Sequence, residues 1–176
     1  MATLYTIGHS TRSGDEFLNV IKAHEIKTLV DIRAFPASKR LPQFNREALE
    51  TSLATAGLQY VWMKALGGYR KKILEDSPHI AIRNARFRNY ADYMLTPEFE
   101  AAMRELLALA EKSHTAYMCA ERVYFQCHRM LVSDWLTAHG HQVLHIDGTS
   151  PAKPHRLMAE ARMIDGKLIY RGDMLL

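Results

Sequence analysis

Residues 115–140, TAYMCAERVYFQCHRMLVSDWLTAHG, decide the fold expected for this chain. The first five residues, TAYMC, form a short apolar run rich in β-favouring side chains, which predicts a buried strand. From Cys127 onward apolar residues recur at helical spacing as far as Gly140, which predicts a helix that ends at that glycine. A strand followed by a short connection and a helix is the repeating unit of parallel α/β sheets.

The same unit recurs along the chain. Further strands are predicted at residues 4–7, 28–32, 59–63 and 142–146, with helical patterns between them. Ser13 and Glu16 have capping-box spacing ahead of a helix, Asn45 can cap another over residues 46–56, and Thr96-Pro97 opens a third. Asp165-Gly166 lies between two β-like runs and predicts a hairpin.

These patterns predict the fold class. We expect one α/β domain over residues 1–176, with three layers, a mainly parallel sheet and a C-terminal β-hairpin. Residues 148–176 are either part of this domain or a C-terminal appendage across the sheet edge. Residues 64–88 show no clear regular pattern, and His79 with residues 83–90 can form a mobile flap.

Composition narrows the class of protein. Hydrophobic residues make up 48% of the 176-residue chain, and 23 Lys and Arg face 19 Asp and Glu, giving a net charge of +4. This mild positive charge fits an anionic small molecule or a nucleic acid without requiring either partner. The chain has no run of apolar residues long enough to span a membrane and no secretion signal, so we expect a cytoplasmic protein. Two cysteines do not make a disulfide scaffold.

Polar or flexible residues follow every predicted strand of the sheet. Because the carboxyl ends of parallel strands meet at one edge, we expect these residues to gather at a single site. The residues are Gly8, His9, Ser10, Asp31, Arg33, Gly67, Gly68, Arg70, Cys119, Glu121, His145 and Asp147.

Several of these residues stand in motifs that together resemble a known family. TIGHS, DIRAFPAS, LGGYR, CAE followed by CHR, and VLHI occur here in that order, over about residues 4–147. In this order they resemble the bacterial and archaeal family known as domain of unknown function 488. The resemblance implies the α/β fold class and this choice of site residues, and it names no reaction.

The two cysteines admit two interpretations. Cys127 opens a helix beside Arg122, His128 and Arg129, surroundings that favour a reactive thiolate, so it is either a nucleophile or redox thiol or a small packed hydrophobe. Cys119 ends an apolar strand, which favours packing. The Cys-x7-Cys-His spacing, even with His9 as a fourth ligand, is not that of common zinc sites, so no metal is predicted.

The remaining candidates have paired interpretations as well. Glu121 is a general base or a solvated carboxylate, and His128 is a proton donor or a helix cap. Asp31 and Arg33 either form a buried ion pair or face a ligand. His9 and Ser10 cradle an anion or make a turn, Gly67 and Gly68 permit close backbone approach, and His155 closes over the site or is solvated.

The sequence as a whole predicts an enzyme that acts on an anionic substrate, phosphorylated or nucleotide-like. Glu121, Cys127 and His128 are the candidates for catalysis, and Arg33, Arg70 and Arg129 for holding the anion. The alternatives are a nucleic-acid-binding module without catalysis and a thiol-redox or sulfur-transfer protein. The sequence indicates neither a cofactor nor an oligomeric state.

Overall fold

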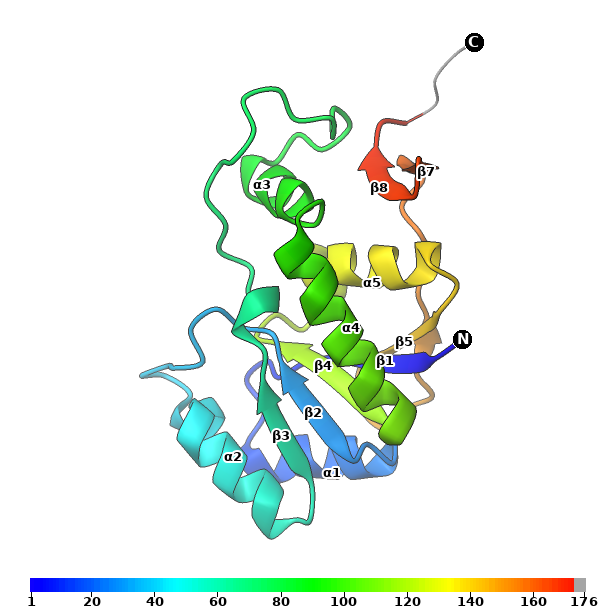
Figure 1. Cartoon of the computed structure of the whole chain (residues 1–176). Coiled ribbons are helices and arrows are strands. Elements are labelled where there is room, and N and C mark those ends of the chain that lie inside the picture. Colours follow the sequence, from blue (N-terminus) through cyan, green and yellow to red (C-terminus); the bar gives the residue numbers. More distant parts are fainter. Residues whose placement is uncertain (173–176) are drawn as a thin grey trace.

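A six-stranded sheet forms the centre of the molecule in the computed structural model, which describes residues 1–172 (Figure 1). The first five strands along the chain are parallel, and the sixth, at the edge of the sheet, runs antiparallel to the fifth. In spatial order the strands are β3 (Gln59–Trp62), β2 (Thr28–Asp31), β4 (Thr115–Cys119), β1 (Thr3–Gly8), β5 (Gln142–Ile146) and β6 (Lys153–Pro154).

Helices cover both faces of this sheet, so the predicted three-layer α/β class is confirmed (Figure 1). One face carries α1 (Gly14–Ala23) and α2 (Arg46–Thr55). The other carries α4 (Pro97–Lys112) and α5 (Arg129–Ala138), and α3 (Ala85–Tyr93) extends that layer.

Strand β4 lies in the middle of the sheet and is buried on both sides. Its side chains alternate between the two cores: Ala116 and Met118 pack in the α1–α2 core, whereas Tyr117 and Cys119 pack in the α4–α5 core. A parallel strand covered by helices on both faces is expected to be apolar throughout. The alternation places the Cys119 side chain on the same side of the sheet as α5.

Local signals for the element ends are largely confirmed. The capping box of Ser13 and Glu16 is formed, and Thr96 caps α4. The hairpin pairs β7 (Ala161–Ile164) with β8 (Lys167–Tyr170), and Asp165 and Gly166 take the positive φ values that its turn needs. Asn45 precedes α2 as predicted, but its side chain accepts a hydrogen bond from the backbone N–H of Ser38 instead of capping the helix.

Two expectations about irregular segments are wrong. Residues 83–90 are not a flap: most of them belong to α3, whose Tyr90 is fully buried, and His79 is fully buried as well. His155 is not solvated but buried. The segment after residue 148 adds β6 to the sheet, and the backbone N–H of Ala81 donates to the carbonyl of Tyr170 at the end of β8.

Gly8, the last residue of β1, is a point of very close backbone contact. The backbone N–H of His9 donates to the carbonyl of Cys119, so the chain leaving β1 stays against the chain leaving β4. A Cβ atom on Gly8 would overlap the backbone carbonyl of Glu121 and would lie 2.8 Å from the Cα of Arg122. The loop after β4 can therefore cross β1 only where residue 8 has no side chain.

We expect Gly8→Ala to lower the free energy of unfolding by about 3 kcal/mol or more, because the added methyl group meets backbone atoms that cannot rotate away. The measurement is urea unfolding of the wild type and the variant. Gly14→Ala is the matched control, since a Cβ there lies 4.0 Å from the nearest side chain. Equal stability of the Gly8 and Gly14 variants would contradict this account.

Candidate functional site

A pocket of about 290 Å³ opens at the carboxyl end of β4. It lies between the chain that follows β2, Gly68 and Tyr69, the first turn of α3, and the loop that joins β4 to α5. The pocket is lined by Arg33, Ala34, Phe35, Gly68, Tyr69, Arg86, Phe87, Cys119, Ala120, Glu121, Gln126, Cys127 and His128.

Both cysteines of the chain lie in the wall of this pocket. Cys119 ends β4, and Cys127 follows a single 3-10 turn, Tyr124–Gln126. Their Sγ atoms are 2.7 Å apart, and the two residues are free thiols with 3% and 8% of their surface exposed. Eight positions apart in sequence, they are brought into contact by the loop between strand and helix.

The two thiols differ sharply in acidity. Burial alone would raise the pKa of Cys127, but hydrogen bonds from Cys119 and His128 and the positive charge of Arg129 hold that pKa well below its ordinary value. The backbone N–H of Arg129, the first residue of α5, also donates to Cys127 Sγ at 3.3 Å. Burial, together with the neighbouring sulfur, raises the pKa of Cys119 well above its ordinary value. These surroundings therefore favour the thiolate form of Cys127 and the thiol form of Cys119.

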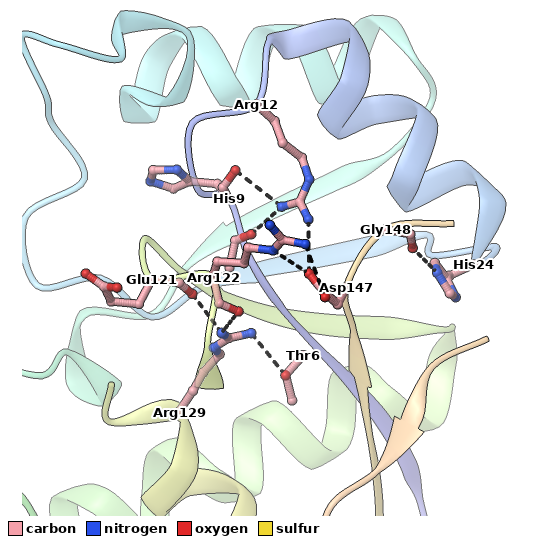
Figure 2. A network of polar contacts seen from close by, with 10 residues as sticks. Thr6, His9, Arg12, His24, Glu121, Arg122, Arg129, Asp147 and Gly148 are labelled. Atoms are coloured by element: carbon pink, nitrogen blue, oxygen red, sulfur yellow. Dashed lines mark hydrogen bonds and ion pairs between the residues drawn. The ribbon is translucent and has the colours of Figure 1, made fainter. Parts of the chain in front are cut away.

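Arg129 supports this pair from beneath the pocket and does not line it. Its side chain is almost fully buried, and it donates to Thr6 Oγ1 at 3.1 Å and to the backbone carbonyls of Glu121 and Arg122 at 2.7 and 3.1 Å (Figure 2). Within residues 1–172 no carboxylate oxygen lies within 4.0 Å of it. Arg129 therefore contacts Glu121 through the backbone carbonyl of that residue and not through its side chain.

His128 and Glu121 line the pocket, and of the two only His128 is a hydrogen-bonding partner of Cys127. His128 Nε2 donates to the carbonyl of Ile32 at 2.9 Å, which fixes the ring orientation. The ring lies so close to Gly68 that a Cβ there would be 2.6 Å from His128 Nδ1, so Gly68 is needed for close approach. The side chain of Glu121 is exposed at the pocket mouth.

Asp31 and Arg33 form the buried ion pair that was one of the two expectations. Arg33 meets both carboxylate oxygens of Asp31, at 2.9 and 2.7 Å, and also donates to the carbonyl of Phe44. Tyr60 donates to the same carboxylate at 2.6 Å. The charge of Arg33 is therefore neutralised within the protein, although its side chain borders the pocket.

The other predicted rim residues lie outside the cysteine pocket. His9 stacks on Phe44 and shares a hydrogen bond with the carbonyl of Ser10, while burial lowers its pKa to about 4, so its ring is neutral and structural. Ser10 faces a separate surface pocket beside Arg12. Gly67 lies against the backbone of Ala34, and Arg70 donates to three backbone carbonyls, those of Lys64, Ala65 and Gly67.

Sequence reasoning missed part of the pocket wall. Phe35 and Arg86 line the pocket, and the guanidinium of Arg86 lies over the ring of Tyr69 at 4.4 Å. Arg86 was missed because its segment was interpreted as a flap, whereas α3 holds it opposite the cysteines. Phe35 lies within one of the recognised motifs, but nothing in the pattern predicted its 69% exposure.

Comparison with known proteins gives one match. The family model described as "Domain of unknown function DUF488" matches residues 13–136. No curated protein and no solved structure matches the chain. In the described part of the chain, no helix combines the length and apolarity that a membrane span requires, and no three His, Cys, Asp or Glu side chains gather as a metal site.

We expect iodoacetamide to alkylate Cys127 at pH 6 about tenfold or more faster than an unstructured cysteine peptide, because the lowered pKa keeps its thiolate populated. Peptide mapping by mass spectrometry identifies the labelled cysteine. The matched comparison is Cys119, whose raised pKa and near-complete burial predict slow labelling. Preferential labelling of Cys119, or labelling of Cys127 only after unfolding, would contradict this assignment.

A second prediction concerns acid stability. The folded pKa of His9, about 4, is below the unfolded value of 6.5, so its contribution is fully present above pH 6.5 and is lost as pH falls towards 4. The loss of unfolding free energy between pH 7 and pH 4.5 should therefore be smaller in His9→Asn, by about 2 kcal/mol. Urea unfolding at the two pH values measures it. His114→Asn, at an exposed histidine, is the control, and an unchanged pH slope in the His9 variant would refute the prediction.

Proposed function

This chain belongs to the family described as domain of unknown function DUF488, and from the geometry of its site we propose that it is a thiol-dependent enzyme. Cys127 is the nucleophile and attacks divalent sulfur in a small anionic substrate, and Cys119 is the second, resolving thiol. Among the functions considered from the sequence, the proposal selects the thiol-redox or sulfur-transfer class.

The observation that carries this proposal is the contact between the two sulfur atoms, 2.7 Å apart in the wall of a pocket. A second thiol in contact with a nucleophilic thiolate is useful when the first product is a disulfide or a persulfide, which the second thiol can attack. Acyl or phosphoryl transfer would instead require an anion clamp that holds the transferred group at the nucleophile. His128 is hydrogen-bonded to Cys127, but the guanidinium groups of Arg33 and Arg129 are held by Asp31 and by backbone carbonyls, so the pair of thiols is the better-supported chemistry.

The reaction has two steps when the substrate is a disulfide, R–S–S–R′. The Cys127 thiolate attacks one sulfur, forms the mixed disulfide Cys127–S–S–R, and expels R′–S⁻. Cys119 then gives up its proton to solvent and attacks Cys127 Sγ, which forms the Cys119–Cys127 disulfide and expels R–S⁻. The substrate gains two electrons, the protein loses two, and a small dithiol in solution restores the reduced pair.

The residues at the mouth of the pocket favour binding of an anionic substrate that carries a ring. Phe35 and Tyr69 are 69% and 63% exposed, and their ring centroids lie 5.6 Å apart. Arg86 is exposed beside them, and within residues 1–172 no ion pair neutralises it. Aromatic side chains next to a cation suit a planar group bearing negative charge.

The first test uses dithiobis(nitrobenzoate), an aromatic disulfide dianion. The reduced wild type is expected to release two nitrothiobenzoate ions per chain and to end as the intramolecular disulfide. Cys119→Ser should release one ion and retain the mixed disulfide on Cys127, whereas Cys127→Ser should react much more slowly. Absorbance and intact mass follow both products. A stable mixed disulfide in the wild type would contradict the resolving role of Cys119. A fast reaction of Cys127→Ser would contradict the assignment of Cys127 as the nucleophile.

A second test addresses the charge of the substrate. Arg86→Ala should slow the reaction of Cys127 with the anionic disulfide several-fold and leave its reaction with a neutral aliphatic disulfide unchanged, because an exposed cation acts mainly through encounter and binding. Arg83→Ala is the matched control, since Arg83 is an exposed arginine near α3 that does not line the pocket. Equal slowing with both disulfides would assign Arg86 a structural role.

A further inference from the structure

A continuous chain of buried hydrogen bonds runs from Arg129, at the start of α5, to Asp134 in the middle of the same helix. Arg129 meets Thr6 Oγ1 at 3.1 Å, and Thr6 Oγ1 lies 2.7 Å from His145 Nδ1. His145 Nε2 lies 2.8 Å from His155 Nδ1, and His155 Nε2 lies 2.7 Å from Asp134 Oδ1. Figure 2 shows the first of these contacts, between Arg129 and Thr6.

The donors and acceptors of this chain run in one direction when Asp134 is a carboxylate and each histidine carries a single proton. Arg129 can only donate, so Thr6 accepts from it, and Thr6 donates its own proton to His145 Nδ1 because the single proton of His145 is on Nε2. A neutral His145 then carries its proton on Nε2 and donates to His155. His155 in turn donates from Nε2 to the carboxylate of Asp134, which also accepts from Tyr170 at 2.9 Å.

Burial explains why this arrangement persists. Thr6 and Asp134 are fully buried, Arg129 is 1% exposed, and His145 and His155 are 8% and 9% exposed. An isolated buried charge is expensive, and here the cation and the carboxylate are linked through a continuous series of hydrogen-bonded groups. Burial lowers the pKa of His145 to about 3, which keeps this link neutral near pH 7.

This network is too deeply buried for a substrate to reach it, as a hydrolytic site would require. Asp, His and a hydroxyl group in hydrogen-bonding order have the composition of a catalytic triad. The hydroxyl of Thr6, however, is fully buried and already accepts from a guanidinium, so no substrate reaches it. The part of the network nearest to the cysteine pocket is Arg129, whose backbone N–H meets Cys127 Sγ.

We propose that Thr6, His145, His155 and Asp134 are positioning residues that hold the guanidinium of Arg129 where it stabilises the Cys127 thiolate. This role goes beyond the proposed function. It rests on the proposed function only in assuming that the Cys127 thiolate is the reacting group. Three hydrogen bonds orient the guanidinium of Arg129. Its Nη2 donates to the backbone carbonyls of Glu121 and Arg122, and its Nη1 donates to Thr6 Oγ1. Without Thr6, the guanidinium is free to turn away from the sulfur.

The proposal makes the C-terminal segment part of the site. His155 directly follows β6, and Tyr170 ends β8, so both come from the chain after residue 148. Thr6, His145, His155 and Tyr170 all lie outside the segment matched by the family model, residues 13–136. The matched segment therefore supplies Cys127, Arg129 and Asp134, while the segments on either side of it supply Thr6, His145, His155 and Tyr170.

Several charged or titratable groups face Cys127 and bear on any measurement of its ionisation. Cys119 approaches from β4, His128 and Arg129 from the start of α5, and Tyr90 from α3. Arg33, Arg86 and Glu121 also line the pocket. Tyr117 lies in β4 beneath the pair, and the pKa values of both tyrosines are raised by burial, so these groups stay neutral while Cys127 titrates.

The test is the pH profile of Cys127 alkylation in Thr6→Val, made in the Cys119→Ser background. We expect the rate at pH 6 to fall about tenfold, with an unchanged plateau at high pH where every thiol is ionised; tenfold corresponds to one pKa unit. A change in pocket access would move the plateau instead. Thr28→Val is the matched control, since Thr28 is a buried strand threonine with two side-chain hydrogen bonds away from the site.

Tyr170→Phe keeps the proposal testable if Thr6→Val does not fold. It removes only the hydroxyl that donates to Asp134, and the rate at pH 6 should fall about two- to threefold with the plateau unchanged. The positioning role is overturned if Thr6→Val has the same profile as its Cys119→Ser parent, or if Tyr170→Phe in that background does so when it is the variant that folds. If the wild type itself shows an ordinary cysteine profile, the thiolate of the proposed function fails, and this is seen independently of the variants.

Discussion

The burial of one guanidinium, that of Arg129, is the constraint on which the site depends. An arginine cannot lose its proton in a protein, so its charge has to be met where it lies. It is met by the carbonyls of Glu121 and Arg122, which hold the loop after β4, and by Thr6, which belongs to the neighbouring strand. The same residue opens α5 and offers its backbone N–H to Cys127. Arg129 therefore connects β1, the loop after β4, α5 and Cys127.

The polar groups at the carboxyl edge of the sheet divide into two kinds. Asp31 and Arg33 neutralise each other, and His9 is held neutral against Phe44, so these residues fix the ends of β1 and β2. The cysteine pair and Arg86 lie in the pocket wall, where a ligand can meet them. Buried ion pairs contribute little net stability when compared with apolar packing, but removing one partner is costly. Asp31, Arg33 and His9 therefore have structural roles at this edge of the sheet, whereas the cysteine pair and Arg86 line the pocket.

Contact between the two sulfur atoms gives the site its chemical character. Each thiol alone is an ordinary buried cysteine, since both side chains are almost inaccessible. Together, one thiol donates to the other, and the helix start and Arg129 favour the charged form of Cys127 only. Phe35 and Tyr69 at the mouth of the same pocket are exposed. The proposed sulfur chemistry rests on the contact between the two thiols, with His128 as a hydrogen-bonding partner of Cys127.

Sequence periodicity alone determined the fold class, because alternating apolar runs and helical spacing are local properties of the chain. It also placed Cys119 at a strand end and Glu121 in the loop that follows. It predicted that Cys127 opens the next helix, whereas α5 begins two residues later, at Arg129. Only the tertiary structure decided which rim residues share a pocket, because Arg70 and Arg129 turn towards backbone carbonyls and Arg86 arrives on a helix that its sequence did not reveal. The network from Thr6 to His145, His155 and Asp134 could not be predicted, since its members are separated by up to 149 positions and meet only through packing. The physical reason is that periodicity reports burial of a face, whereas hydrogen-bond partners in a core depend on how separate elements are placed in space.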